Sequence, residues 1–224
     1  ALGRSAMTNT TTGDNNTCVG QNAGANITTA DYNTAVGSDA LLTSTTATKN
    51  TAIGYEALEA TTTGSYNTAV GSNCMKTNTT GASNVAVGQG ALNLNTTGSN
   101  NVAIGVNVLD ANTTAGNNTA VGFQAMTDNT TGGLNAAIGR EALFKNTTGS
   151  QNTACGTYTL YENLTGSENT AVGYVALEKN TASYNTAVGS RALDLNTTGS
   201  SNTAVGYQSL TSSTTSSNNT ALGH

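Results

Sequence analysis

Residues 84–100 read NVAVGQGALNLNTTGSN, and residues 101–105 begin the same unit again as NVAIG. The unit has 17 residues. Its glycine recurs at that spacing over Gly3–Gly173 and again, after one 16-residue step, over Gly189–Gly223. A fixed period of this length is typical of a solenoid, in which each repeat forms one coil and stacks on its neighbours. We therefore expect about 13 coils of 17 residues.

The composition argues against several classes of partner. Among 224 residues there are 7 basic and 12 acidic ones, a net charge of −5, and no basic cluster. Nucleic acids and anionic membranes therefore have no electrostatic attraction to this chain. No apolar run approaches the ~20 residues that a membrane-spanning helix needs.

Because Ala1-Leu2-Gly3 ends one unit and Gly223-His224 begins another, we interpret residues 1–224 as one array cut from a longer repetitive protein.

One asparagine column is invariant along the chain. Counting from each glycine as position 0, the idealised unit is G-x-x-A-L-x-x-N-T-T-G-S-x-N-T-A-V, and position 13 is Asn in every unit. Stacked amides can hydrogen-bond from coil to coil and form a ladder, or the Asn can cap a turn, and the two roles are compatible. The predicted ladder contains Asn16, Asn33, Asn50, Asn67, Asn84, Asn101, Asn118, Asn135, Asn152, Asn169, Asn185, Asn202 and Asn219.

The N-T-A-V segments, for example 33–36 and 67–70, have the β-branched residues and the alternation of short strands. Stacked about 4.8 Å apart, they predict an all-β fold, a parallel β-solenoid or β-roll. We expect Val and Thr to pack inside their own coil and the Ala/Asn face to point outward. Because both faces are nearly uniform, the outward one needs cover from the return segment or from another chain. The second option predicts an oligomer, most simply of three chains.

The x-x-A-L-x-x segments, such as 55–60 and 140–145, have helix-forming residues at helical spacing but are too short for an independent helix. Each coil then carries either one short helical turn or a second short strand, and we favour the strand. The N-T-T-G-S segments, such as 95–99, predict a return loop. The 16-residue unit supports this reading, since it has lost one residue within 180–184.

Charged residues occupy only positions 1, 2, 5, 6, 11 and 12, which predicts that these positions are the exposed corners of the coil. The three cysteines stand where other units have Ala or Val. We interpret Cys18, Cys74 and Cys155 as small buried hydrophobes, with an interchain bond or a reactive thiol as the alternative.

Paired threonines at positions 8 and 9 suggest a monomeric ligand-binding solenoid, such as an ice-binding protein, as a second candidate function. At most one column of each pair can face outward. The pairs are Thr28/Thr29, Thr45/Thr46, Thr62/Thr63, Thr79/Thr80, Thr96/Thr97, Thr113/Thr114, Thr130/Thr131 and Thr147/Thr148.

The return loop also contains N-x-T sequons. They predict either a sugar-coated stripe on an exported protein or simply turn residues. The candidate glycosylation sites are Asn78, Asn95, Asn112, Asn129, Asn146, Asn163 and Asn196.

Residues for enzyme chemistry are sparse. The one histidine, His224, is the last residue, so no Ser/His or Cys/His nucleophile pair can form within one chain. Neither G-x-x-x-x-G-K-[ST] nor G-x-G-x-x-G occurs, and the calcium-binding nonapeptide pattern with its regular Asp is missing. We expect no enzymatic activity, no cofactor and no metal site.

The segments NVAIG at 101–105 and NVAVG at 84–88, with the many N-T-A-V-G units, resemble the N-S-V-A-I-G-x-x-S repeats of YadA-like trimeric autotransporter adhesin heads. They also resemble the arrays of phage tail-fibre-like proteins, although the 17-residue period is longer than that of the adhesin heads. The resemblance covers the whole chain. It implies a trimeric, left-handed parallel β-roll at the cell surface, outside the cell or on a virion. The expected function is a structural or adhesive fibre segment that self-associates as a trimer or filament and meets a host-surface receptor or glycan.

Overall fold

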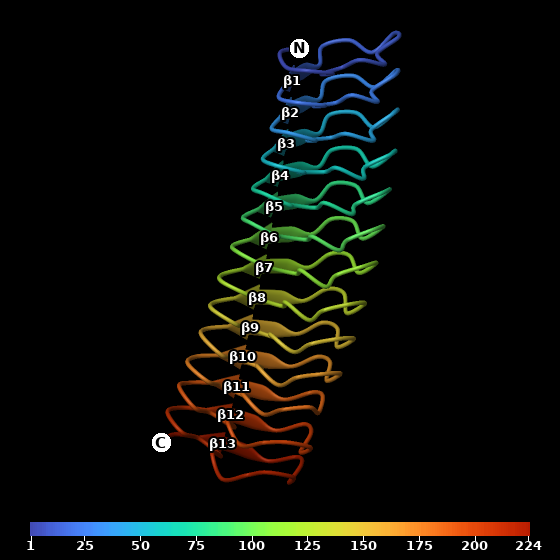
Figure 1. The fold of residues 1–224 in the computed structure, drawn as a ribbon. Coiled ribbons are helices and arrows are strands. Elements are labelled where there is room, and N and C mark those ends of the chain that lie inside the picture. Colours follow the sequence, from blue (N-terminus) through green and yellow to red (C-terminus); the bar gives the residue numbers. More distant parts are fainter. The chain divides into compact units, whose positions relative to one another are not determined.

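The computed structural model describes all 224 residues, and its only regular elements are thirteen three-residue β-strands. Each strand is the T-A-V part of one unit, flanked by Asn before it and Gly after it. Figure 1 labels them along the chain. They are β1 (Thr17–Val19), β2 (Thr34–Val36), β3 (Thr51–Ile53), β4 (Thr68–Val70), β5 (Val85–Val87), β6 (Val102–Ile104), β7 (Thr119–Val121), β8 (Ala136–Ile138), β9 (Thr153–Cys155), β10 (Thr170–Val172), β11 (Thr186–Val188), β12 (Thr203–Val205) and β13 (Thr220–Leu222).

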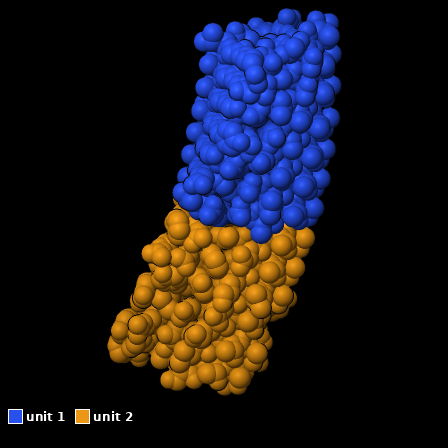
Figure 2. All heavy atoms as spheres, in the orientation of Figure 1, with its two compact units in different colours: residues 1–116 blue, residues 117–224 orange.

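The coils fall into two compact units, residues 1–116 with β1–β6 and residues 117–224 with β7–β13, coloured separately in Figure 2. Within each unit, every strand pairs with the next strand of the chain, in parallel. The register matches equivalent residues, as in Ala35 opposite Ala52 and Val36 opposite Ile53. The parallel β-solenoid expected from the period is therefore confirmed in both units.

The two faces of the strands are the reverse of the expectation. The strand alanines, such as Ala52 and Ala69, are fully buried, and so is the Asn before each of these strands. The Thr and Val side chains point out of the coil, where Ile53 is 39% exposed. A one-turn coil of 17 residues has a narrow interior that admits Ala and hydrogen-bonded amides beside one Leu, so the β-branched residues lie outside.

The return segment of the same chain covers the Ala/Asn face. Its alanine at position 3 and Leu or Met at position 4 are buried, as Ala57, Leu58 and Met75 show. Of the two kinds of cover considered for that face, the structure uses the chain's own segment. The Ala/Asn face therefore needs no second chain to cover it, and it no longer supports the predicted oligomer.

The segment after each strand is neither the helical turn nor the second strand expected. Glu56 and Leu58 have φ angles of 55° and 52°, and the residue between them does not share this left-handed conformation. The alternation aims successive amides in opposite directions: Glu56 N–H donates to Ser38 O of the preceding coil at 3.0 Å, and Leu58 N–H to Cys74 O of the following coil at 3.0 Å. Helical bonds would stay within the segment, whereas stacking under 5 Å requires bonds along the axis.

The glycine at position 0 allows the coils to approach closely. Gly88 has a φ of 134°, and a Cβ built on it would lie 2.2 Å from the carbonyl oxygen of Gly105 in the next coil. Any side chain there would be strained by its backbone conformation and would overlap the neighbouring main chain. This explains why position 0 is glycine in every unit.

Candidate binding surfaces

Each strand Asn forms part of a ladder, as the invariant column predicts. The Oδ1 atom of Asn84 accepts the backbone N–H of Asn101 at 2.9 Å and its Nδ2 at 3.2 Å. Its own Nδ2 donates to the carbonyl oxygen of Gly98 at 2.9 Å. Its Nδ2 also donates to Asn67 Oδ1 of the preceding coil at 3.2 Å. The amide therefore joins three successive coils and, being buried, does so away from water.

A second Asn ladder runs at position 7, and the sequence reasoning missed it. Asn95 Nδ2 donates to Asn78 Oδ1 at 2.8 Å, and Asn112 Nδ2 donates to Asn95 Oδ1 at 2.9 Å. Asn95 Nδ2 also reaches Gly98 O at 3.0 Å, so the two ladders meet at one carbonyl. The sequence contains a signal for this ladder, because Asn recurs at position 7 in most units.

The same geometry corrects the glycosylation hypothesis. The candidate sites Asn78, Asn95, Asn112, Asn129, Asn146, Asn163 and Asn196 are all fully buried. A side-chain amide inside the coil that bonds its neighbours is not accessible to a glycosylating enzyme and has no room for a sugar. The expected surface stripe at these residues is therefore wrong for the folded protein.

The outward side of the strands is a regular surface, which we call the strand face. It consists of positions 14 and 16, and no coil has a charged residue there. Ile104 is 40% exposed and Ile138 49%. Position 14 is Thr in ten strands, and these hydroxyl groups form no hydrogen bond to the chain: Thr17, Thr34, Thr51, Thr68, Thr119, Thr153, Thr170, Thr186, Thr203 and Thr220.

In seven of the eight pairs the loop threonines divide as expected, with one column facing outward, whereas Thr45 and Thr46 are both exposed. At position 8, Thr62 and Thr79 are half-buried, and each donates its hydroxyl to the carbonyl of the same position one coil on, at 3.2 and 3.0 Å. At position 9, Thr63 and Thr80 are exposed. The outward column is therefore position 9.

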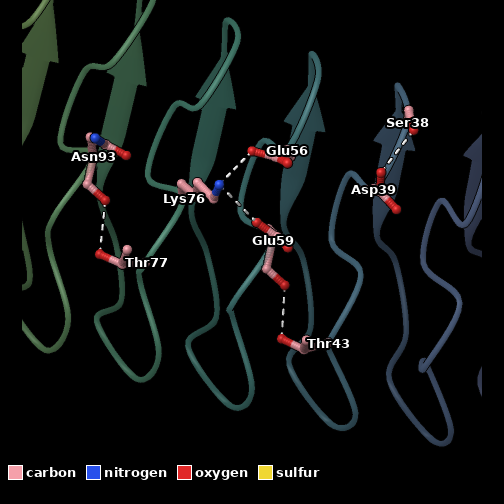
Figure 3. Close-up of polar contacts among 8 residues, drawn as sticks. All are labelled: Ser38, Asp39, Thr43, Glu56, Glu59, Lys76, Thr77 and Asn93. Carbon is pink, nitrogen blue, oxygen red and sulfur yellow. Dashed lines mark hydrogen bonds and ion pairs between the residues drawn. The ribbon is translucent and has the colours of Figure 1, made fainter.

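Charged side chains lie at the predicted corners, and none of the nineteen is buried. Figure 3 shows one group in which Lys76 Nζ contacts Glu56 Oε2 at 2.6 Å and Glu59 Oε2 at 3.6 Å, across neighbouring coils. The ammonium group of Lys76 lowers the pKa of Glu56, and Glu56 in turn raises the pKa of Lys76. In the same view Thr43 and Thr77 donate to backbone carbonyls of the next coil, at Glu59 and Asn93.

The cysteines are not alike. Cys18 and Cys74 are buried, as expected, and burial raises the pKa of Cys74 to about 12. Cys155 replaces Val at position 16 of β9 and is exposed, so its expected burial is wrong. The reason is the reversed strand faces, because position 16 points away from the coil interior.

No pocket opens on the chain, and no group of three or more His, Cys, Asp or Glu side chains is placed to hold a metal ion. No helix in it has the length and apolar character needed to cross a membrane. A scan of protein-family models gives no match to the chain, and neither curated proteins nor solved structures give a significant one.

Proposed function

We propose that the chain is a structural segment of a fibre or surface appendage, outside the cell or on a virion, and that it self-associates as a trimer or filament. The observation that supports this most directly is the exposed strand face. The resemblance to trimeric adhesin heads and tail fibres supports the same reading.

Parallel sheets are almost always covered on both faces. Here the inward face has its cover from the return segment, while Val and Ile at position 16 are only partly covered by the same chain. Other exposed positions accept Lys, Arg, Asp and Glu, yet the strand face has none. A regular, uncharged exposed surface with an apolar column along it is typical of a contact between proteins. The partner with matching periodicity is another copy of the same chain.

Sedimentation velocity tests this proposal with lysines on the strand face. The variant Ile53→Lys/Ile104→Lys/Ile138→Lys places three charges on that face, whose burial in a contact is costly. The matched control Thr63→Lys/Thr114→Lys/Thr148→Lys adds the same charge at exposed position 9. We expect wild type and control to sediment as oligomers and the strand-face variant as a monomer.

Two outcomes would contradict self-association through this face. One is a wild-type chain that remains monomeric at its highest soluble concentration. The other is a strand-face variant that assembles as wild type does while keeping the wild-type circular dichroism spectrum.

A monomeric ice-binding protein is the second candidate, and one observation favours it. The hydroxyls at positions 14 and 9 have no partner in the chain and recur in most coils, about 4.8 Å apart where successive coils both carry them. Such an array can hydrogen-bond an ordered layer of water. Thermal hysteresis in wild type, lost in either the strand-face or the position 9 variant, would support this function and identify the column. Absence of hysteresis in wild type rejects it.

A further inference from the structure

The chain has ten aromatic residues, two Phe and eight Tyr, and five of them lie within residues 123–174. In the second unit they contact one another and two cations on the surface. We call this group the aromatic cluster: Phe123, Phe144, Tyr158, Tyr161 and Tyr174, with Arg140 and Lys145.

One row of the cluster runs along the coil stack. The guanidinium carbon of Arg140 lies 5.8 Å from the ring centre of Phe123 and 5.7 Å from that of Tyr158. The rings of Tyr158 and Tyr174 meet edge to face at 6.5 Å. These residues come from four successive coils, so the row spans three coil steps, about 14 Å at strand spacing. Phe123 is 46% exposed and Tyr174 51%.

A second set of rings supports this row. Phe144 and Tyr161 stack at 5.2 Å with 6° between their planes, and Tyr161 meets Tyr158 edge to face at 5.8 Å. The ammonium group of Lys145 lies 5.3 Å from the Tyr161 ring centre. Because each ring is held by a neighbour, little side-chain freedom remains to be lost when a ligand binds.

The coil does not need aromatic residues at these positions. Elsewhere position 1 is often Ser, as in Ser72 and Ser190, and position 2 is Asn in Asn73 and Asn107. None of the five rings is buried, so they add nothing to the interior. Their apolar faces remain in water, which is an energetic cost unless a ligand covers them.

The charges around the cluster define the chemistry of that ligand. Arg140 Nε pairs with Glu141 at 3.0 Å, and Lys145 Nζ pairs with Glu162 at 3.3 Å, so the cluster together with these two carboxylates has no net charge. A nucleic acid or sulfated polymer needs uncompensated positive charge and is therefore disfavoured. A neutral ligand with a flat apolar face and a hydroxyl-rich edge fits instead. Ring faces attract polarised C–H groups, and the paired charges offer donors and acceptors to hydroxyls.

We propose that the aromatic cluster binds a neutral oligosaccharide, with its sugar rings lying along the row from Phe123 to Tyr174. The row is longer than one sugar, which selects a chain over a monosaccharide. This inference goes beyond the proposed self-association and does not depend on it, because a separate group of side chains makes the contact.

A glycan array with neutral and sulfated glycans, with oligo-dT spotted in the same format, tests the inference. The cluster variant Phe123→Ser/Tyr158→Asn/Tyr174→Ser uses residues that the chain itself has at these positions. Asn suits the φ of 58° at Tyr158. The matched control Tyr55→Ser/Tyr207→Ser removes two exposed aromatics at position 1 outside the cluster. We expect wild type and control to bind a subset of the neutral glycans, and the cluster variant to bind them at least tenfold more weakly.

Three results would overturn the inference: no binding to any neutral glycan, equal binding by the cluster variant, or preferred binding to sulfated glycans or oligo-dT. Circular dichroism establishes that the variants are folded. Sedimentation of the same samples reports self-association separately, so failure of one proposal does not hide the outcome of the other.

Discussion

Two buried asparagines of the repeat at residues 84–100, Asn84 and Asn95, accept hydrogen bonds from different kinds of donor. The Oδ1 atom of Asn84 accepts a backbone N–H, that of Asn101, whereas Asn95 Oδ1 accepts only the side-chain amide of Asn112. Both Asn84 and Asn95 donate to the Gly98 carbonyl. A buried backbone donor has no alternative partner when its acceptor is removed. This difference explains why position 13 is Asn in every unit while position 7 also holds Ile, Ser and Thr.

The substitutions Asn84→Thr and Asn95→Thr test this distinction. We expect Asn84→Thr to lower the free energy of unfolding by roughly 2–4 kcal/mol, because the Asn101 N–H loses its acceptor in the interior. Asn95→Thr should cost only about 1–2 kcal/mol, because the Gly98 carbonyl keeps its bond from Asn84. Urea unfolding followed by circular dichroism measures both. Equal losses of unfolding free energy would contradict a greater contribution from the hydrogen bond between the Asn101 N–H and Asn84 Oδ1.

Asp110 predicts a pH effect. Burial raises the pKa of its carboxyl group, against a smaller opposite effect of the Asn93 side chain. The charged form is therefore less favourable in the folded state, and the cost is present at neutral pH and is lost as pH falls through the folded pKa. We expect Asp110→Asn to raise Tm at pH 7, with no difference below the unfolded pKa of about 3.9. Asp14→Asn, at an exposed position, controls for net charge, and a pH-independent difference would contradict the assignment.

At the scale of the element, the coil tolerates change in the loop and not in the strand. In the 16-residue coil, Thr181 still donates to Thr197 O at 2.9 Å as a position 8 residue. The Ala182 carbonyl accepts Asn169 and Asn180 in the place of position 10. The missing residue is therefore position 9, which is otherwise an exposed Thr. Strand β11 keeps its register with β10 and β12, so the loop absorbs the whole deletion.

Single-residue deletions in one coil should reproduce this contrast. Deleting Thr97 at position 9 recreates the natural short coil and should cost about 1 kcal/mol or less. Deleting Ala86 from β5 moves the following residues to the opposite face, which we expect to cost at least about 3 kcal/mol. Thermal unfolding compares the two variants. A Thr97 deletion as damaging as the Ala86 deletion would show that the loop is not the adaptable segment.

At the scale of the whole molecule, each unit depends on stacking between neighbouring coils. A typical coil buries only one large aliphatic side chain, and its burial alone cannot offset the backbone entropy that the ordered residues of the coil lose. No coil is stable alone, and local opening requires loss of contacts to neighbours on both sides. Chemical access to interior groups therefore reports on the integrity of the stack.

The three cysteines provide this measurement. At pH 8 and at concentrations where the chain is monomeric, we expect maleimide to modify Cys155 alone. Burial keeps Cys18 and Cys74 out of reach, and the pKa of Cys74, about 12, keeps its thiol protonated. Mass spectrometry should show one adduct in the folded chain and three in denaturant. If the strand face forms the proposed contact, labelling of Cys155 slows at concentrations that favour the oligomer. Rapid labelling of all three thiols would contradict a closed stack.

The sequence by itself determined the solenoid, its period, the strand positions, the Asn column and the charged corners. These follow from spacing along the chain, and a 17-residue period repeats the same local chemistry in every coil. Only the tertiary structure decided which strand face lies inside. The reason is volume: the interior of the coil accommodates Ala, Asn and one Leu, so Val and Thr point outward although they are the more β-branched pair. That choice also decided the exposure of Cys155. The burial of the sequon asparagines and the alternating backbone after each strand depended on the stacking of the coils, which only the tertiary structure shows.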